Sequence, residues 1–162
     1  DGIRDDLVTG VQTCALPIYL WDIYLPGRSR YYLKGDAFAA VIGAMCSLGY
    51  GYYHGSGFSA RDGRSVGSDS HFNGINGDFR YLGINGCHKD GPVLVSHVDR
   101  FDWDANVRFV NALYLFGYKS FGSQVMKRKG QPNRTLPHVT FTNGDHDNHL
   151  HLQGYQPNIQ DI

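Results

Sequence analysis

The chain has 162 residues, of which 41% are apolar and 19% charged, a composition typical of one folded domain of ordinary size. Its 15 basic and 15 acidic residues balance to a formal net charge of zero, which argues against a nucleic-acid-binding protein or another general polyanion binder. No apolar run reaches the roughly 18 residues that a membrane-spanning helix needs, so no integral membrane segment is expected.

The first eighteen residues resemble the translation of a common sequencing-library adapter. They read D-G-I-R-D, then two residues where an index is translated, then V-T-G-V-Q-T-C-A-L-P-I. We therefore expect residues 1–18 to be an artefactual or disordered leader and residues 19–162 to form a single domain. A source in environmental DNA follows from this expectation, as does the loss of any upstream signal peptide.

Hydrophobic spacing predicts two helices. Asp36 is expected to cap the first, over residues 36–48, and Asp102 or Asp104 is expected to cap the second, over residues 103–116. In the first segment apolar residues recur at i, i+3, i+4 and i+7, which is the period of one helical face, and in the second Val107, Val110, Leu113 and Tyr114 form an apolar stripe.

Short strands are predicted around these helices. They fall within residues 49–57 and over residues 92–97, 139–142 and 149–152. Two helices among short strands, without βαβ alternation, predict an α+β fold. We expect a small antiparallel sheet that carries a zinc site and is flanked by the helices. Outside the leader, Cys46 and Cys87 could form one disulfide or be two buried thiols, and their spacing matches no metal site.

The residues that carry chemistry gather in two segments, S-H-F-N-G-I-N-G-D and D-H-D-N-H-L-H. In a strand, His149 and His151 project from the same face, where both imidazoles could bind a metal ion, or one could bind it while the other assists the chemistry. His71 and Asp78 are separated by a glycine-containing turn and can reach one ion together. Two His and one carboxylate leave a position for water, which is typical of a catalytic zinc site.

Such a zinc ion would support hydrolysis. It lowers the pKa of a bound water towards ~7 and polarises a scissile carbonyl. All acidic residues of the chain are Asp, so an Asp or a His must accept the proton from water. Asp145, Asp147 and His149 are the candidates for this general base. A neighbouring protonated His could stabilise the oxyanion or pass a proton to the leaving amine.

The two segments resemble the motifs of the zinc metallopeptidases that group D-Ala-D-Ala peptidases, lysostaphin-type enzymes and the hedgehog signalling domain. They are most similar to the penicillin-insensitive murein endopeptidases, with His-x-x-Gly-x-x-x-Asp followed far downstream by His-Asp-x-His-x-His. The resemblance implies that His71, Asp78 and His151 are the ligands of Zn²⁺. It also implies that His146 and His149 are catalytic histidines beside the metal.

The same resemblance implies the substrate. It points to peptide crosslinks of bacterial peptidoglycan, or to short D-amino-acid-containing peptides, cut by a D,D-endopeptidase or a carboxypeptidase-like enzyme. The protein would then be periplasmic or secreted, or act as a phage lysin. Two positions depart from the pattern. Ser68 stands where the murein enzymes carry a further His, and Asn148 stands where other branches carry a carboxylate base.

Three other functions are weighed against a peptidase. A non-catalytic zinc-binding recognition domain of the same fold would hold the metal and hydrolyse nothing. A structural or phage-particle protein with a His-rich metal site would be expected to trimerise, and the sequence has no coiled-coil or repeat signature. A serine hydrolase, with a nucleophilic Ser, is the third alternative.

Overall fold

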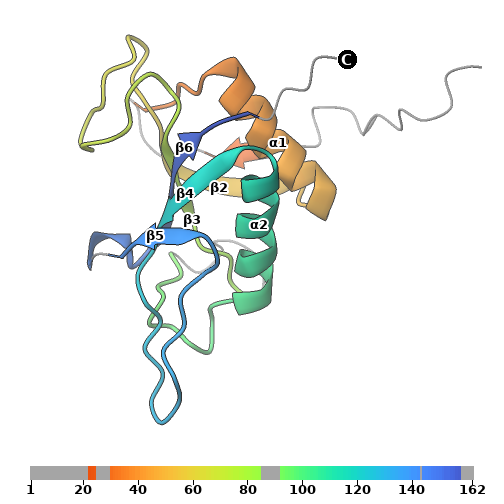
Figure 1. Cartoon of the computed structure of the whole chain (residues 1–162), viewed down its shortest axis with the longest axis vertical. Coiled ribbons are helices and arrows are strands. Elements are labelled where there is room, and N and C mark those ends of the chain that lie inside the picture. Colours follow the sequence, from red (N-terminus) through yellow and green to blue (C-terminus); the bar gives the residue numbers. More distant parts are fainter. Residues whose placement is uncertain (1–21, 25–29, 85–91, 143, 158–162) are drawn as a thin grey trace, which may run out of the picture.

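The computed structural model of the chain describes four ranges of residues, namely 22–24, 30–84, 92–142 and 144–157. Within them, two helices lie on one side of a single sheet (Figure 1). The predicted α+β fold is thereby confirmed. The expected leader, residues 1–18, lies outside the described residues, and so does Cys87, one of the two cysteines whose pairing was left open.

The sheet is mixed, with antiparallel strands at its centre. Its strands are β1 (Asp22–Tyr24), β2 (Tyr52–Gly57), β3 (Gly77–Arg80), β4 (Tyr118–Gly122), β5 (Val139–Phe141) and β6 (His149–Tyr155). They lie in the order β1-β2-β3-β6-β4-β5. The pairs β2–β3, β3–β6 and β4–β6 are antiparallel, whereas β1–β2 and β4–β5 are parallel.

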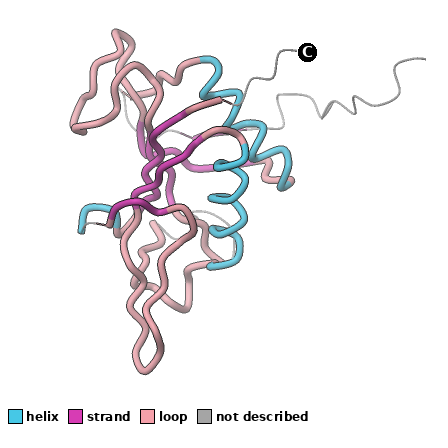
Figure 2. Tube along the Cα trace, viewed as in Figure 1, coloured by secondary structure: helices cyan, strands magenta, loops and turns pink. Residues whose placement is uncertain are grey.

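The expected antiparallel pairing is therefore found at the centre of the sheet, whereas the pairs at its two edges are parallel. A parallel pair needs a long connection between its strands, because the chain must return to the end at which it started. The connection between β4 and β5 is such a segment, and it extends well away from the sheet (Figure 2).

The helices are α1 (Gly35–Leu48) and α2 (Trp103–Leu115). Of the two predicted caps of α2, Asp102 is the one observed, and its Oδ1 accepts a hydrogen bond from the Ala105 N–H at 2.9 Å. Asp36 does not cap α1, because the N-cap position belongs to Lys34. The Asp36 carboxylate lies in the first turn instead, where it accepts the Ala37 N–H and pairs with Lys34 Nζ at 3.0 Å. In the described residues no helix has the length and apolar character to span a bilayer.

Aromatic rings fill the space between the sheet and α2. Phe109 of α2 stacks on Tyr53 of β2 with 4.2 Å between ring centroids, and it meets the edge of Phe79 of β3 at 5.9 Å. All three side chains are at most 1% exposed. Because strand residues alternate between faces, this apolar face leaves the opposite face of β3 and its neighbours free for polar residues.

The predicted strand over residues 92–97 is wrong, because this segment forms turns. The His97 N–H donates to the Leu94 carbonyl at 3.0 Å, which closes a local turn. The Val95 N–H donates to the Asp147 carbonyl at 2.8 Å, and Val95 is 3% exposed. The apolar run thus buries its side chains as a loop that is tied to the segment before β6.

Candidate metal centre

Strands β3 and β6 bring the two sequence motifs together. In their antiparallel register Asp78 lies opposite His151, and Arg80 lies opposite His149. Phe79, between the two β3 residues, is fully buried on the helical side. The polar side chains therefore share the face away from the helices, as the alternation along residues 149–151 predicted for the two His.

A left-handed turn before β3 brings His71 to the same place. Asn73 and Gly74 have φ angles of 56° and 65°. A Cβ on Gly74 would lie 2.6 Å from the Lys34 nitrogen, so only glycine lets this turn pack against that backbone. The loop is fixed further by the His71 N–H, which donates to Ser65 Oγ at 3.1 Å. The glycine of the first motif thus positions the histidine.

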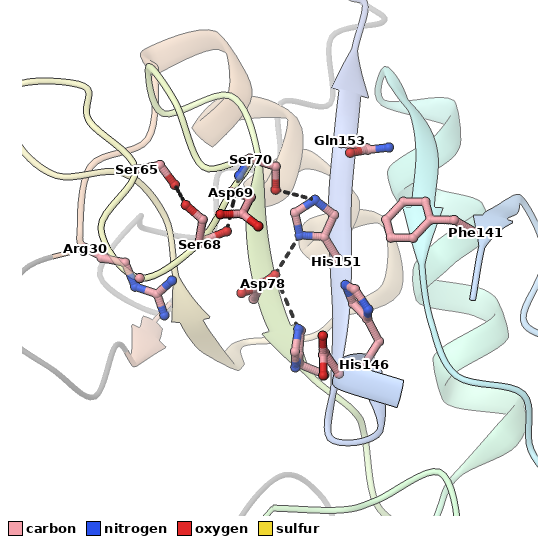
Figure 3. Close-up of a pocket in the computed structure, with 13 residues that line it drawn as sticks. Arg30, Ser65, Ser68, Asp69, Ser70, Asp78, Phe141, His146, His151 and Gln153 are labelled. Atoms are coloured by element: carbon pink, nitrogen blue, oxygen red, sulfur yellow. Dashed lines mark hydrogen bonds and ion pairs between the residues drawn. The ribbon is translucent and has the colours of Figure 1, made fainter. Parts of the chain in front are cut away.

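His71, Asp78 and His151 form a buried cluster that could hold a metal ion. His71 Nε2 lies 3.1 Å from Asp78 Oδ1 and 3.2 Å from His151 Nδ1, and the latter two atoms are 2.8 Å apart. Zinc–ligand bonds of ~2.0–2.1 Å in a tetrahedron place ligand atoms about 3.3 Å from one another. The three atoms therefore have nearly the separations of one face of a zinc tetrahedron. Figure 3 shows Asp78 and His151 facing each other from neighbouring strands.

The charge on Asp78 suits a cation. Burial raises the pKa of this carboxyl group, but hydrogen bonds with His151 and His71 and the charges of His71 and His149 outweigh it. The net effect holds the pKa of Asp78 well below its usual range. The side chain is therefore a carboxylate throughout the pH range in which zinc binds His nitrogen.

An open cavity of about 980 Å³ lies over the cluster. It is lined by Arg30, Ser65, Gly67, Ser68, Asp69, Ser70, Asp78, Phe141, Asp145, His146, His149, His151 and Gln153. The serine-rich loop and Arg30 form one side, whereas Phe141 and His146 lie on the other side of His151 (Figure 3). A ligand in this cavity would meet a polar surface that includes Asp78 and His151 of the cluster, whereas His71 is fully buried and is not among the lining residues.

His146 reaches the cavity from the single-turn helix η2 (Gly144–His146). Its ring lies 4.9 Å from the ring of His149 and 5.6 Å from that of His151. Gly122 makes this approach possible, since a Cβ there would lie 3.0 Å from His146 Nε2. Burial, together with the charges of His149 and His151, lowers the pKa of His146 to about 4. The imidazole is therefore neutral at pH 7.

The η2 turn is held by a buried tyrosine. The Tyr81 hydroxyl donates to the His146 carbonyl oxygen at 2.9 Å and lies 2.7 Å from Ser123 Oγ. Burial raises the pKa of Tyr81, so the hydroxyl keeps its proton. The Gln124 N–H donates to the same carbonyl at 3.2 Å.

Tyr81→Phe is expected to lower the free energy of unfolding by about 1–2 kcal/mol, because it removes both hydrogen bonds of a buried hydroxyl. Urea unfolding of both proteins measures the change. Tyr155→Phe is the matched control, because its hydroxyl also donates to a backbone carbonyl, that of Asp36, but at an exposed position. Equal losses in the two variants would contradict a special role for Tyr81.

The three candidates for the general base do not all line the cavity. His149 and Asp145 both line the cavity. Asp147 is not among the lining residues, and its carbonyl is bound by the Val95 N–H. Burial and the charge of Arg80 lower the pKa of His149, although Asp78 opposes them. The catalytic roles of these residues and of His146 remain predictions.

Three polar residues at the cavity were missed by the sequence analysis. Ser70 Oγ lies 3.3 Å from His151 Nε2, and Arg30 Nη1 lies 3.4 Å from His71 Nδ1. Gln153 continues the cavity-facing side of β6. The alternation along β6 was a signal for Gln153, whereas Arg30 is 41 residues from its neighbour in sequence and had none.

Comparison with known proteins found no matching family model, no matching curated protein and no matching solved structure. The fold and the site therefore define the class of this protein by themselves. It is an α+β domain in which strands β3 and β6 and the loop before β3 form a buried His-Asp-His cluster beside a polar cavity, and this cluster could hold a metal ion.

Proposed function

We propose that the protein is a zinc-dependent peptidase that hydrolyses peptide crosslinks of bacterial peptidoglycan. The observation that carries the proposal is the cluster of His71, Asp78 and His151, which opens on a cavity. Two imidazoles and one carboxylate are a nitrogen and oxygen donor set that suits zinc. Among the described residues, three side chains offer ligand atoms to one ion, so a fourth place is left for water or substrate.

Bound zinc would supply a Lewis acid that polarises the scissile carbonyl and activates water. The chain's own residues would do the rest. His146 and His149 flank the cluster within the cavity and can exchange protons at their ring nitrogens. Arg30 lies at the other side of the cavity, where its guanidinium can bind an anionic group of the substrate.

Peptidoglycan as the substrate is supported by the two motifs and by the character of the cavity. The lining is mostly polar and the cavity is open, which suits a branched and hydrated polymer better than a small apolar ligand. A protein with this substrate would act in the periplasm, after secretion, or as a phage lysin. Short D-amino-acid-containing peptides would be alternative substrates of the same site.

Incubation of the zinc-loaded protein with purified sacculi tests this function. We expect crosslinked dimers of the stem peptides to disappear and monomers to increase by the same amount, as measured by chromatography of the fragments. A chelator should abolish the release, because the chemistry depends on the metal. Penicillin should leave it unchanged, because no serine nucleophile takes part.

Other outcomes would point to other functions. Free glycan strands with intact stem peptides would indicate an amidase, and the proposed crosslink specificity would be wrong. Zinc binding without release from sacculi or from D-Ala-D-Ala peptides would favour the non-catalytic zinc-binding recognition domain. His138→Ala is the control for nonspecific effects of removing an imidazole, because His138 stacks on Tyr114 and is not among the residues that line the cavity.

A further inference from the structure

A chain of hydrogen bonds runs from Arg80 through Asn148 to His149 beside the metal centre. Arg80 Nη1 donates to Asn148 Oδ1 at 2.8 Å and lies 3.3 Å from the Asn148 carbonyl oxygen. His149 Nδ1 lies 2.8 Å from the same Oδ1. Arg80 and His149 are cross-strand neighbours on β3 and β6, so the sheet itself fixes their spacing.

In each hydrogen bond of this chain, only one of the two groups can be the donor. A guanidinium has donors and no acceptor, so Arg80 requires that Asn148 present its carbonyl oxygen and not its NH₂ group. That oxygen has lone pairs and no hydrogen. His149 Nδ1 must therefore carry a proton, because a lone pair at 2.8 Å from Oδ1 would be repelled.

The other ring nitrogen of His149 then has the lone pair. A neutral imidazole holds one N–H, and here Nδ1 holds it. His149 Nε2 lies 3.7 Å from Asp78 Oδ1, so the lone pair is on the side of the cluster. The side chain is 18% exposed, which leaves it accessible from the cavity.

We propose that Arg80 and Asn148 are positioning residues that hold His149 in its Nδ1–H tautomer and so make His149 Nε2 the proton acceptor of the site. This inference rests on the proposed hydrolysis. As the water oxygen bonds to the scissile carbonyl carbon, one water O–H bond breaks and its proton moves to Nε2. When the C–N bond breaks, the imidazolium returns that proton to the leaving nitrogen.

The inference also accounts for Asn148. An amide has no basic atom, so it cannot replace a carboxylate as the base. It can act through His149, because its oxygen selects the tautomer. Among the open candidates, His149 is then favoured over Asp145, which is exposed, and over Asp147, which does not line the cavity.

Nitrogen NMR of the ¹⁵N-labelled full chain, loaded with zinc, tests the tautomer directly. Long-range ¹⁵N–¹H correlations distinguish a protonated from an unprotonated ring nitrogen. We expect Nδ1 of His149 to be protonated and Nε2 to be unprotonated. Asn148→Leu and Arg80→Met should each raise the population with a proton on Nε2, whereas Asn148→Asp should keep the wild-type signature, because a carboxylate oxygen also accepts from Nδ1–H.

Variants that change the tautomer of His149 should also lower kcat. In Asn148→Leu we expect kcat on sacculi to fall at least about tenfold with KM within about twofold, since the proton acceptor is lost but the binding surface remains. A wild-type His149 with its proton on Nε2 would overturn the inference, and so would an unchanged tautomer in both Asn148→Leu and Arg80→Met. If the NMR signature is as expected but no hydrolysis is detected, the proposed function is wrong and the tautomer assignment stands, because the NMR signature does not depend on turnover.

Discussion

Replacing His71 or His151 with alanine is expected to weaken zinc binding at least about 100-fold and to abolish hydrolysis with it. The free energy of zinc binding at a protein site is about 10 kcal/mol or more and comes from few ligands. Removing one ligand is therefore expected to cost about 3 kcal/mol of it. Both side chains are at most 4% exposed, so water cannot easily replace the missing nitrogen. Zinc titration against a competing chelator measures the affinity.

The matching variant is His149→Ala. Its Nε2 lies 3.7 Å from Asp78 Oδ1, and it is not part of the cluster of three ligand atoms. We therefore expect this variant to keep most of the zinc affinity and to lose turnover. Loss of zinc from His149→Ala to the level of His151→Ala would show that His149 is a ligand, and the three-residue assignment would be wrong.

The sequence could predict the parts of the fold that depend on neighbouring residues. The strand period placed His149 and His151 on one face, and the capping preference of Asp limited the cap of α2 to Asp102 or Asp104, of which the structure shows Asp102. The prediction failed where distant backbone groups decide the conformation. The strand expected over residues 92–97 is a loop because the Asp147 carbonyl accepts the Val95 N–H.

In the candidate site, too, some residues could be predicted from local sequence and others could not. The resemblance of the two motifs to those of zinc metallopeptidases implied His71, Asp78 and His151, which the structure brings together in the cluster that could hold a metal ion. The neighbours that orient them come from distant segments, as Arg30 does at His71 and Tyr81 does at His146. The tautomer of His149 could not be predicted from sequence, because it depends on which atom of Asn148 faces Arg80.

Phe79→Ala is expected to lower the free energy of unfolding by about 3–5 kcal/mol, as is usual when a fully buried aromatic ring is removed. Phe79 is 0% exposed and contacts the rings of Tyr53, Phe58 and Phe109. This loss is a large part of the ~5–15 kcal/mol that stabilises an ordinary domain. Urea unfolding measures it, and Phe72→Ala is the control.

Phe72 is 53% exposed, so the same substitution there should cost less than about 1 kcal/mol. Equal losses would mean that β3 does not bury its helical face. Asp78, the residue before Phe79, lies on the other face of β3, so Phe79→Ala leaves the candidate metal ligands in place.

Excess zinc at about 100 times its Kd adds about 2.7 kcal/mol to the free energy of unfolding of a protein that binds it only when folded. Zinc should therefore raise the melting temperature of Phe79→Ala, whose ligands are intact, and leave that of His151→Ala nearly unchanged.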